Sequence, residues 1–128
     1  MSYYFAKTLT LGFDEAAQRT IEALKREGFG IITEIDVKDT FKKKLDVDFR
    51  SYRILGACSP ALAHEALLLE DKVGTMLPCN VVVQDIGGGR TEVAAIDPVA
   101  SMQAINNPRL KEAAERVQAK LKAVVDSL

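Results

Sequence analysis

The sequence of 128 residues has little of several features that define large classes of protein. It has one histidine, two cysteines and a formal net charge of −1, from 17 Lys and Arg against 18 Asp and Glu. A near-zero charge argues against nucleic-acid binding, which normally uses a basic surface. No apolar run approaches the roughly 20 residues that a membrane span needs. The opening residues also lack the basic and apolar regions of a signal peptide, so we expect a cytoplasmic protein.

The scarcity of histidine and cysteine limits the chemistry that the chain can carry. A single histidine cannot form a multi-histidine metal site, and no C-x-x-C spacing is present. Two cysteines without an export signal indicate thiols rather than a disulfide framework. We find no complete catalytic constellation, and we expect neither a metal nor another cofactor.

The chain also lacks repeats, low-complexity stretches and flexible linkers. With 48% hydrophobic and 27% charged residues, its composition is that of an ordinary globular protein. Its length is close to the most common size of one domain. We therefore expect a single α+β domain over residues 1–128.

Local patterns in the first half predict three strands and one long helix. Residues 3–9, 29–37 and 52–58 are rich in β-forming side chains and indicate strands. Residues 13–27 have apolar side chains at helical spacing, with Gly28 in the position of a left-handed cap. The lysine-rich residues 39–45 suggest phosphate binding, but flanking aspartates favour a solvated helical turn, and we discard this segment as a site.

The second half predicts two helices and a hairpin. Ser59-Pro60 is a strong helix start, with Ser as the cap and Pro in the first turn. The helix that follows, through residue 69, is apolar on nearly every side, so it must be buried on several sides or against another subunit. Strands at residues 79–86 and 91–96 flank three glycines, which favour a hairpin turn over a phosphate loop.

The closing helix, residues 108–128, begins with Asn107 as cap and Pro108 in the first turn. The predicted order is β-α-β-β-α-β-β-α. Hairpins mixed with helical crossovers favour a two-layer α+β sandwich, with helices on one face of a mostly antiparallel sheet.

The most distinctive candidate site is the start of the Ser59 helix. Cys58 lies one residue before the cap, where free backbone N–H groups favour a thiolate or a small bound anion. Cys79 approaches Cys58 if their strands are antiparallel neighbours, but lies at the opposite end of the sheet if the helix is a parallel crossover. The sequence leaves both arrangements open. The candidate ligand-binding residues are Cys58, Ser59, His64, Cys79 and Asn80.

Polar side chains within the apolar strands allow two interpretations. Arg53 is expected to pair with an Asp or Glu if it faces the core. Glu34 and Asp36 are better explained as facing outward on a half-exposed sheet. Asn80 is the one most suited to bonding backbone near the Cys58 helix start.

Three blocks resemble the domain of unknown function 302 family: residues 28–67, MLPCNVVV at 76–83 and AAIDPVASM at 94–102. The resemblance covers nearly the whole chain. It implies a prokaryotic α+β domain of the TATA-binding-protein-like class that forms a homodimer and has no established activity. The signature positions are Cys58, Pro60, Pro78, Cys79, Asn80, Asp97 and Pro98. The likeness to a DNA-bending fold does not suggest DNA binding, because fold does not imply function.

Two functional hypotheses follow. The first is a non-enzymatic dimeric module that binds a small molecule, a small anion or a partner near the Ser59 helix start. The alternative is a thiol- or metal-dependent activity centred on Cys58 and Cys79.

Overall fold

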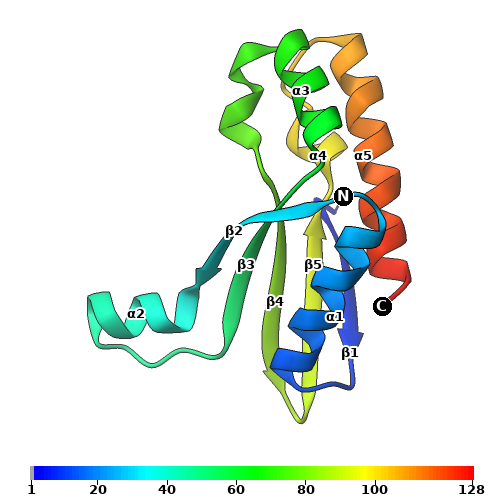
Figure 1. Ribbon diagram of the computed structural model, residues 1–128. Coiled ribbons are helices and arrows are strands. Elements are labelled where there is room, and N and C mark those ends of the chain that lie inside the picture. Colours follow the sequence, from blue (N-terminus) through cyan, green and yellow to red (C-terminus); the bar gives the residue numbers. More distant parts are fainter. Residues whose placement is uncertain (1) are drawn as a thin grey trace.

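A computed structural model describes residues 2–128 and confirms the α+β class (Figure 1). Its strands are β1 (Tyr4–Leu9), β2 (Gly30–Asp36), β3 (Tyr52–Cys58), β4 (Cys79–Gly87) and β5 (Arg90–Ile96). Its helices are α1 (Phe13–Arg26), α2 (Val37–Leu45), α3 (Pro60–Leu69), α4 (Pro98–Ser101) and α5 (Pro108–Asp126), with a 3₁₀ helix η1 (Asp71–Met76) after α3.

The five strands form one antiparallel sheet in the order β1-β5-β4-β3-β2. Side chains on one face alternate with those on the other. The face toward α1 and α5 buries the main core, in which Leu24, Leu55 and Leu121 are fully enclosed. Three valines of β4 and β5 are enclosed with them: Val81, Val83 and Val93. The opposite face is partly exposed, and across it run the register partners Ala6, Ala94, Val82, Ile54 and Ile35.

The local signals at turns and helix ends are confirmed. Gly28 has φ +86°, and its N–H and that of Phe29 donate to carbonyls in the last turn of α1. The three glycines of the β4–β5 turn all have positive φ. Asn107 accepts hydrogen bonds from the N–H groups of Arg109 and Leu110 at the start of α5.

Two predictions about local structure need correction. Val37 is not the end of a strand but the first residue of α2, because the Asp36 carboxylate accepts a hydrogen bond from Asp39 N and caps a nine-residue helix. Ser59 occupies the N-cap position of α3, but its side chain makes no capping hydrogen bond. The helix start there depends on the backbone and on Pro60.

The polar strand residues lie near one end of β2 and β3. Arg53 forms an ion pair with Glu34 at 3.2 Å, which confirms the predicted pairing of this arginine. Its guanidinium also lies 5.1 Å from the centre of the Phe13 ring. Glu34 and Asp36 are exposed, but the predicted outward placement needs correction: their register partners are Leu55 and Arg53, so they lie on the helix-covered face, and they are exposed because β2 is the edge strand.

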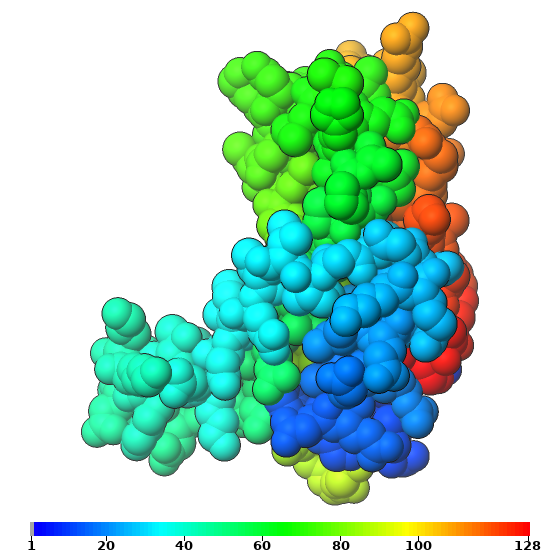
Figure 2. All heavy atoms as spheres, in the orientation of Figure 1, coloured from blue at the N-terminus to red at the C-terminus, as the bar shows by residue number. Residues whose placement is uncertain are grey.

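The helices outside the main layer are arranged very differently from one another. In Figure 2, α2 and its neighbouring residues project from the body, and α2 has no buried residue. In contrast, α3 and η1 extend beyond the end of the sheet, where α3 lies beside α5 and η1 lies beside α3. This second group encloses the candidate site.

Candidate functional site

The connection between β3 and β4 brings the two cysteines to the same end of the sheet. The strands are antiparallel neighbours, and Ala57 is the register partner of Cys79. Cys58 therefore lies next to Cys79 across the strand pair. This settles the alternative that the sequence left open, because the helix between the strands is not a parallel crossover.

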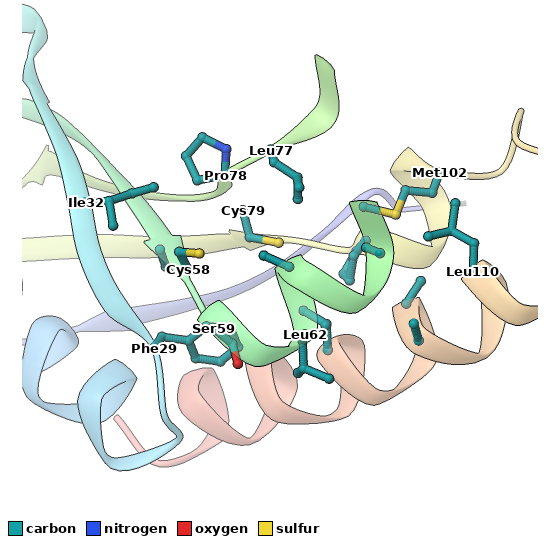
Figure 3. Close-up of a pocket in the computed structure, with 17 residues that line it drawn as sticks. Phe29, Ile32, Cys58, Ser59, Leu62, Leu77, Pro78, Cys79, Met102 and Leu110 are labelled. Carbon is teal, nitrogen blue, oxygen red and sulfur yellow. The ribbon is translucent and has the colours of Figure 1, made fainter. Parts of the chain in front are cut away.

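An apolar cavity of about 210 Å³ opens beside these strand ends (Figure 3). Its floor is formed by Ala57, Cys58 and Cys79, and α3 with the following segment covers it as a roof. The inner turns of α5 and the region of α4 form the wall. The remaining lining residues are Phe29, Ile32, Ser59, Leu62, Ala63, Ala66, Leu77, Pro78, Pro98, Met102, Leu110, Ala113, Ala114 and Val117. No charged side chain is among them.

The roof is tied to the wall by specific polar contacts. The Asn107 side-chain amide donates to the Leu69 carbonyl at 3.1 Å, joining the end of α3 to the start of α5. The Asp97 carboxylate caps α4 and accepts a hydrogen bond from Gln118 on α5. These contacts hold the helices around the cavity at fixed positions.

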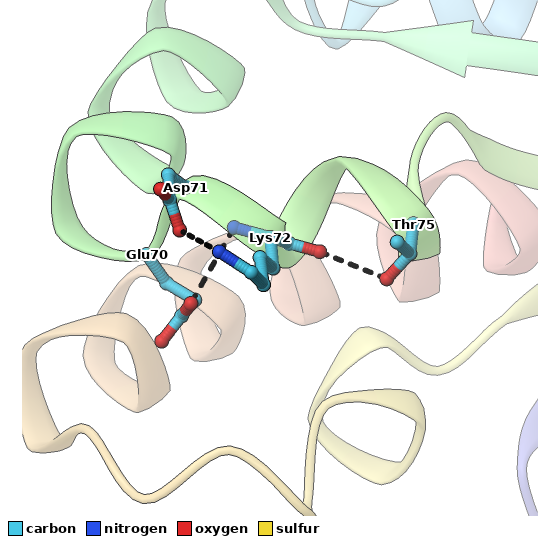
Figure 4. Close-up of polar contacts among 4 residues, drawn as sticks. All are labelled: Glu70, Asp71, Lys72 and Thr75. Carbon is cyan, nitrogen blue, oxygen red and sulfur yellow. Dashed lines mark hydrogen bonds and ion pairs between the residues drawn. The ribbon is translucent and has the colours of Figure 1, made fainter.

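The corner between α3 and η1 is stabilised on its outer side (Figure 4). The Glu70 carboxylate accepts from the Lys72 N–H, and the Thr75 hydroxyl donates to the Lys72 carbonyl at 2.8 Å. The Lys72 ammonium lies 3.2 Å from Asp71 Oδ1. Below this corner Val73 is fully buried with Ala66 and Leu110. The polar groups thus remain outside while the apolar side chains close the roof.

Gly56 explains how the floor reaches this geometry. A side chain at this position would collide with the Thr33 hydroxyl and would place a Cβ 2.8 Å from Pro78 Cγ. Glycine therefore allows β2 and the segment before β4 to approach β3 closely. The sequence contained this residue in the predicted strand, but the need for it becomes visible only when Thr33 and Pro78 are placed.

The two cysteines differ in environment. Cys79 is buried and Cys58 is partly exposed. Burial, together with the nearby Cys58, raises the pKa of the Cys79 thiol from 9.0 to about 11. Cys79 is therefore a neutral thiol at neutral pH.

The structure brings together three of the five predicted site residues. Cys58, Ser59 and Cys79 line the cavity. His64 is exposed and does not line it, because it lies on the outer side of α3. Asn80 is also exposed and lines a neighbouring groove of about 260 Å³ that shares Leu77, Pro78 and Cys79 with the cavity. No hydrogen bond of its side chain to residues 2–128 is present, so the predicted contact with backbone at the helix start is absent there.

The sequence did not indicate the wall residues that follow α4 or lie on α5, above all Met102, Ala113 and Ala114. Small residues on the apolar face of α5 resembled ordinary core positions. The only available signal was the pair of alanines, whose small side chains leave space between α3 and α5.

The signature blocks lie within a match to a known protein family. The sequence matches the domain of unknown function DUF302 over residues 5–128. The chain belongs to this family. A DUF302 crystal structure, that of an uncharacterized conserved protein from Bacillus stearothermophilus, is 31% identical with a TM-score of 0.90 and covers 98% of each chain. Comparison with curated proteins gave no match.

The DUF302 membership confirms the resemblance found in the sequence blocks and extends it through α5. Within residues 2–128, no helix is both long and apolar enough to cross a membrane. Those residues also contain no cluster of three or more His, Cys, Asp or Glu side chains suited to a metal ion. The cavity is therefore the best-defined feature from which to argue a function.

Proposed function

We propose that this DUF302 protein is a non-enzymatic, dimeric module that binds a small, uncharged and largely apolar molecule in the cavity beneath α3. The observation that carries the proposal is the lining itself, which is apolar apart from Ser59 and the two thiols. Ligand sites are typically concave and apolar with a few polar groups. The cavity has no charged side chain that could pair with an ionised organic ligand, so the desolvation of such a ligand would not be compensated.

The cavity volume limits the size of the occupant. An apolar cavity of about 150 Å³ is known to hold benzene. A volume of about 210 Å³ therefore suits a ligand, or the buried part of one, with one or two rings. A larger molecule would have to extend through the opening.

The chemistry of the lining favours binding over acid–base catalysis. General acids and bases are usually His, Asp, Glu or Lys. None of these residue types lines the cavity, and His64 lies on the exposed side of the roof helix. The composition of the lining therefore supports the non-enzymatic interpretation.

Calorimetric titration with indole and with naphthalene tests the binding proposal. Ala63→Leu places a larger side chain at a lining position and is expected to weaken binding at least tenfold. Ala61→Leu is the matched control, because Ala61 is an exposed residue of the same helix. Equal affinities for the two variants, or no binding of either compound to the wild type at millimolar concentration, would contradict the proposal.

The dimer part of the proposal is supported by the outer side of α3. Leu67 and Leu68 are 43% and 75% exposed on a helix that has little polar character. Covering these side chains with a second copy would remove apolar surface from water. Light scattering should give twice the chain mass, and Leu68→Glu should shift the protein toward the monomer. A wild-type monomer at tens of micromolar would refute this part.

A second candidate function is a thiol-dependent activity. The observation that favours it is the placement of Cys58 and Cys79 side by side at the floor of one cavity. Labelling with iodoacetamide as a function of pH, followed by mass spectrometry, measures the reactivity of each thiol. If neither cysteine reacts in the folded protein, this candidate is excluded.

A further inference from the structure

Three sulfur atoms belong to the lining of the same apolar cavity. Cys58 and Cys79 come from neighbouring strand ends, and Met102 follows α4 (Figure 3). In Figure 3, the thiol groups of Cys58 and Cys79 both point toward the space beneath α3. The cavity thus combines a pair of thiols with a thioether, although the sequence separates these residues by up to 44 positions.

Few other metal-ligating side-chain atoms line the cavity, so its sulfur atoms decide which metal ion it favours. Apart from the Ser59 hydroxyl, no side-chain oxygen or nitrogen lines the cavity. Zinc normally has four N, O or S ligands in a tetrahedral arrangement. Copper(II) prefers nitrogen and oxygen ligands in a tetragonal arrangement. Soft thiolate and thioether ligands instead suit copper(I).

We propose that Cys58 and Cys79 bind one copper(I) ion through their two sulfur atoms. This inference rests on the same cavity as the proposed function and names a different class of ligand for it. An occupied site would leave the apolar walls around the ion, where they limit access of water.

The protons and charges of the binding step balance. Each thiol loses one proton to solvent as its sulfur binds, so one copper(I) ion and two thiols give a complex of charge −1 and two protons. The positive end of α3 begins directly after Cys58 and favours this negative charge. The first N–H groups of a helix have no intrahelical partner, and the Ser59 side chain accepts from none of those in α3.

Burial of Cys79 opposes the loss of its proton. Metal binding must therefore displace a proton from a thiol whose pKa is about 11. The apparent affinity for copper(I) should consequently increase with pH across the neutral range.

Anaerobic titration of the reduced full chain with copper(I), in competition with bicinchoninate, provides the test. We expect one ion per chain and an absorption band from thiolate-to-copper charge transfer. Cys58→Ser and Cys79→Ser should each weaken binding by more than tenfold. Met102→Leu should leave the affinity near the wild-type value, because Met102 lines the cavity away from the two thiols (Figure 3).

The outcomes separate this inference from the proposed function. Wild-type protein that binds naphthalene but not copper(I), or equal copper(I) affinities in wild type and Cys58→Ser, overturns the metal site alone. Equally tight binding of zinc also overturns it. Wild-type protein that binds copper(I) but not naphthalene overturns the apolar-ligand proposal instead. Because Cys79 is buried, circular dichroism must first show that Cys79→Ser is folded. If that variant is unfolded, the copper(I) affinity of Cys58→Ser decides the test, because Cys58 is partly exposed.

Discussion

Apolar residues are packed differently in the main core and in the region beneath α3. On the helix-covered face of the sheet, sixteen buried residues form one cluster in which Leu24, Leu55 and Val83 are entirely enclosed. Beneath α3 a separate buried cluster has three members, Ala66, Val73 and Leu110, and members of both clusters line the open cavity. Similar side chains thus fill space in one region and surround space in the other.

This contrast predicts which property each substitution should change. Close-packed interiors lose contacts when a side chain is shortened, so the cost appears as stability. A residue that lines an open cavity can be enlarged into existing space, so the cost appears as ligand affinity. Two substitutions and one change of pH test this difference between stability and ligand affinity, from the largest expected effect on stability to the smallest.

Leu24→Ala should destabilise the protein by about 3 kcal/mol, because it removes a fully enclosed side chain from the main core. Chemical denaturation measures the change in the free energy of unfolding. Naphthalene affinity should remain near the wild-type value, since Leu24 does not line the cavity. A loss of less than about 1 kcal/mol would show that the main core is not close-packed at this position.

Alkaline pH should weaken the fold through Cys79. The pKa of the Cys79 thiol is 9.0 for an unperturbed cysteine, as in the unfolded chain, and about 11 in the folded protein. The folded state therefore holds the proton more tightly. The resulting stability is complete below pH 9 and is lost as the pH rises to 11, by up to about 2–3 kcal/mol. The measurement is the free energy of unfolding of wild type and Cys79→Ala at pH 8 to 11. Parallel curves for the two proteins would refute the contribution of this thiol.

Asn107→Ala should cost about 1 kcal/mol, because it removes the cap of α5. It also removes the hydrogen bond to the Leu69 carbonyl, which joins the cavity roof to its wall. Thermal denaturation measures the stability, and naphthalene titration should show weaker binding. Asn106→Ala is the matched control at an exposed neighbouring position. Equal behaviour of the two variants would show that the roof does not depend on this contact.

Features governed by neighbouring residues could be predicted from the sequence. The end of α1 at Gly28, the start of α5 at Asn107 and the glycine turn between β4 and β5 each depend on a few adjacent residues. The α2 boundary was wrong because the alternating pattern of β2 continues through Val37, while the helix is started by the Asp36 side chain. Val37 continues the strand pattern and also follows a good helix cap, so local rules alone do not decide between strand and helix at this residue.

The candidate site depended on information of longer range. The sequence placed Cys58 at a strand end and Cys79 at a strand start, but only the antiparallel pairing of β3 with β4 brings them together. The position of His64 could not be derived, because α3 is apolar on nearly all sides and its pattern does not identify an inner face. The wall residues on α5 lie on a helix that begins about fifty positions after Cys58 in the chain.

The roof of the cavity is also a single insertion within a β-hairpin. Residues 59–78 leave the sheet at the end of β3 and return to it at the start of β4, where the two strands are already hydrogen-bonded partners. An insertion with adjacent ends can change in length or composition without altering the register of the strands that carry it. The β3–β4 ladder therefore anchors the roof, and a change within residues 59–78 can reshape the cavity without moving the strands that carry it.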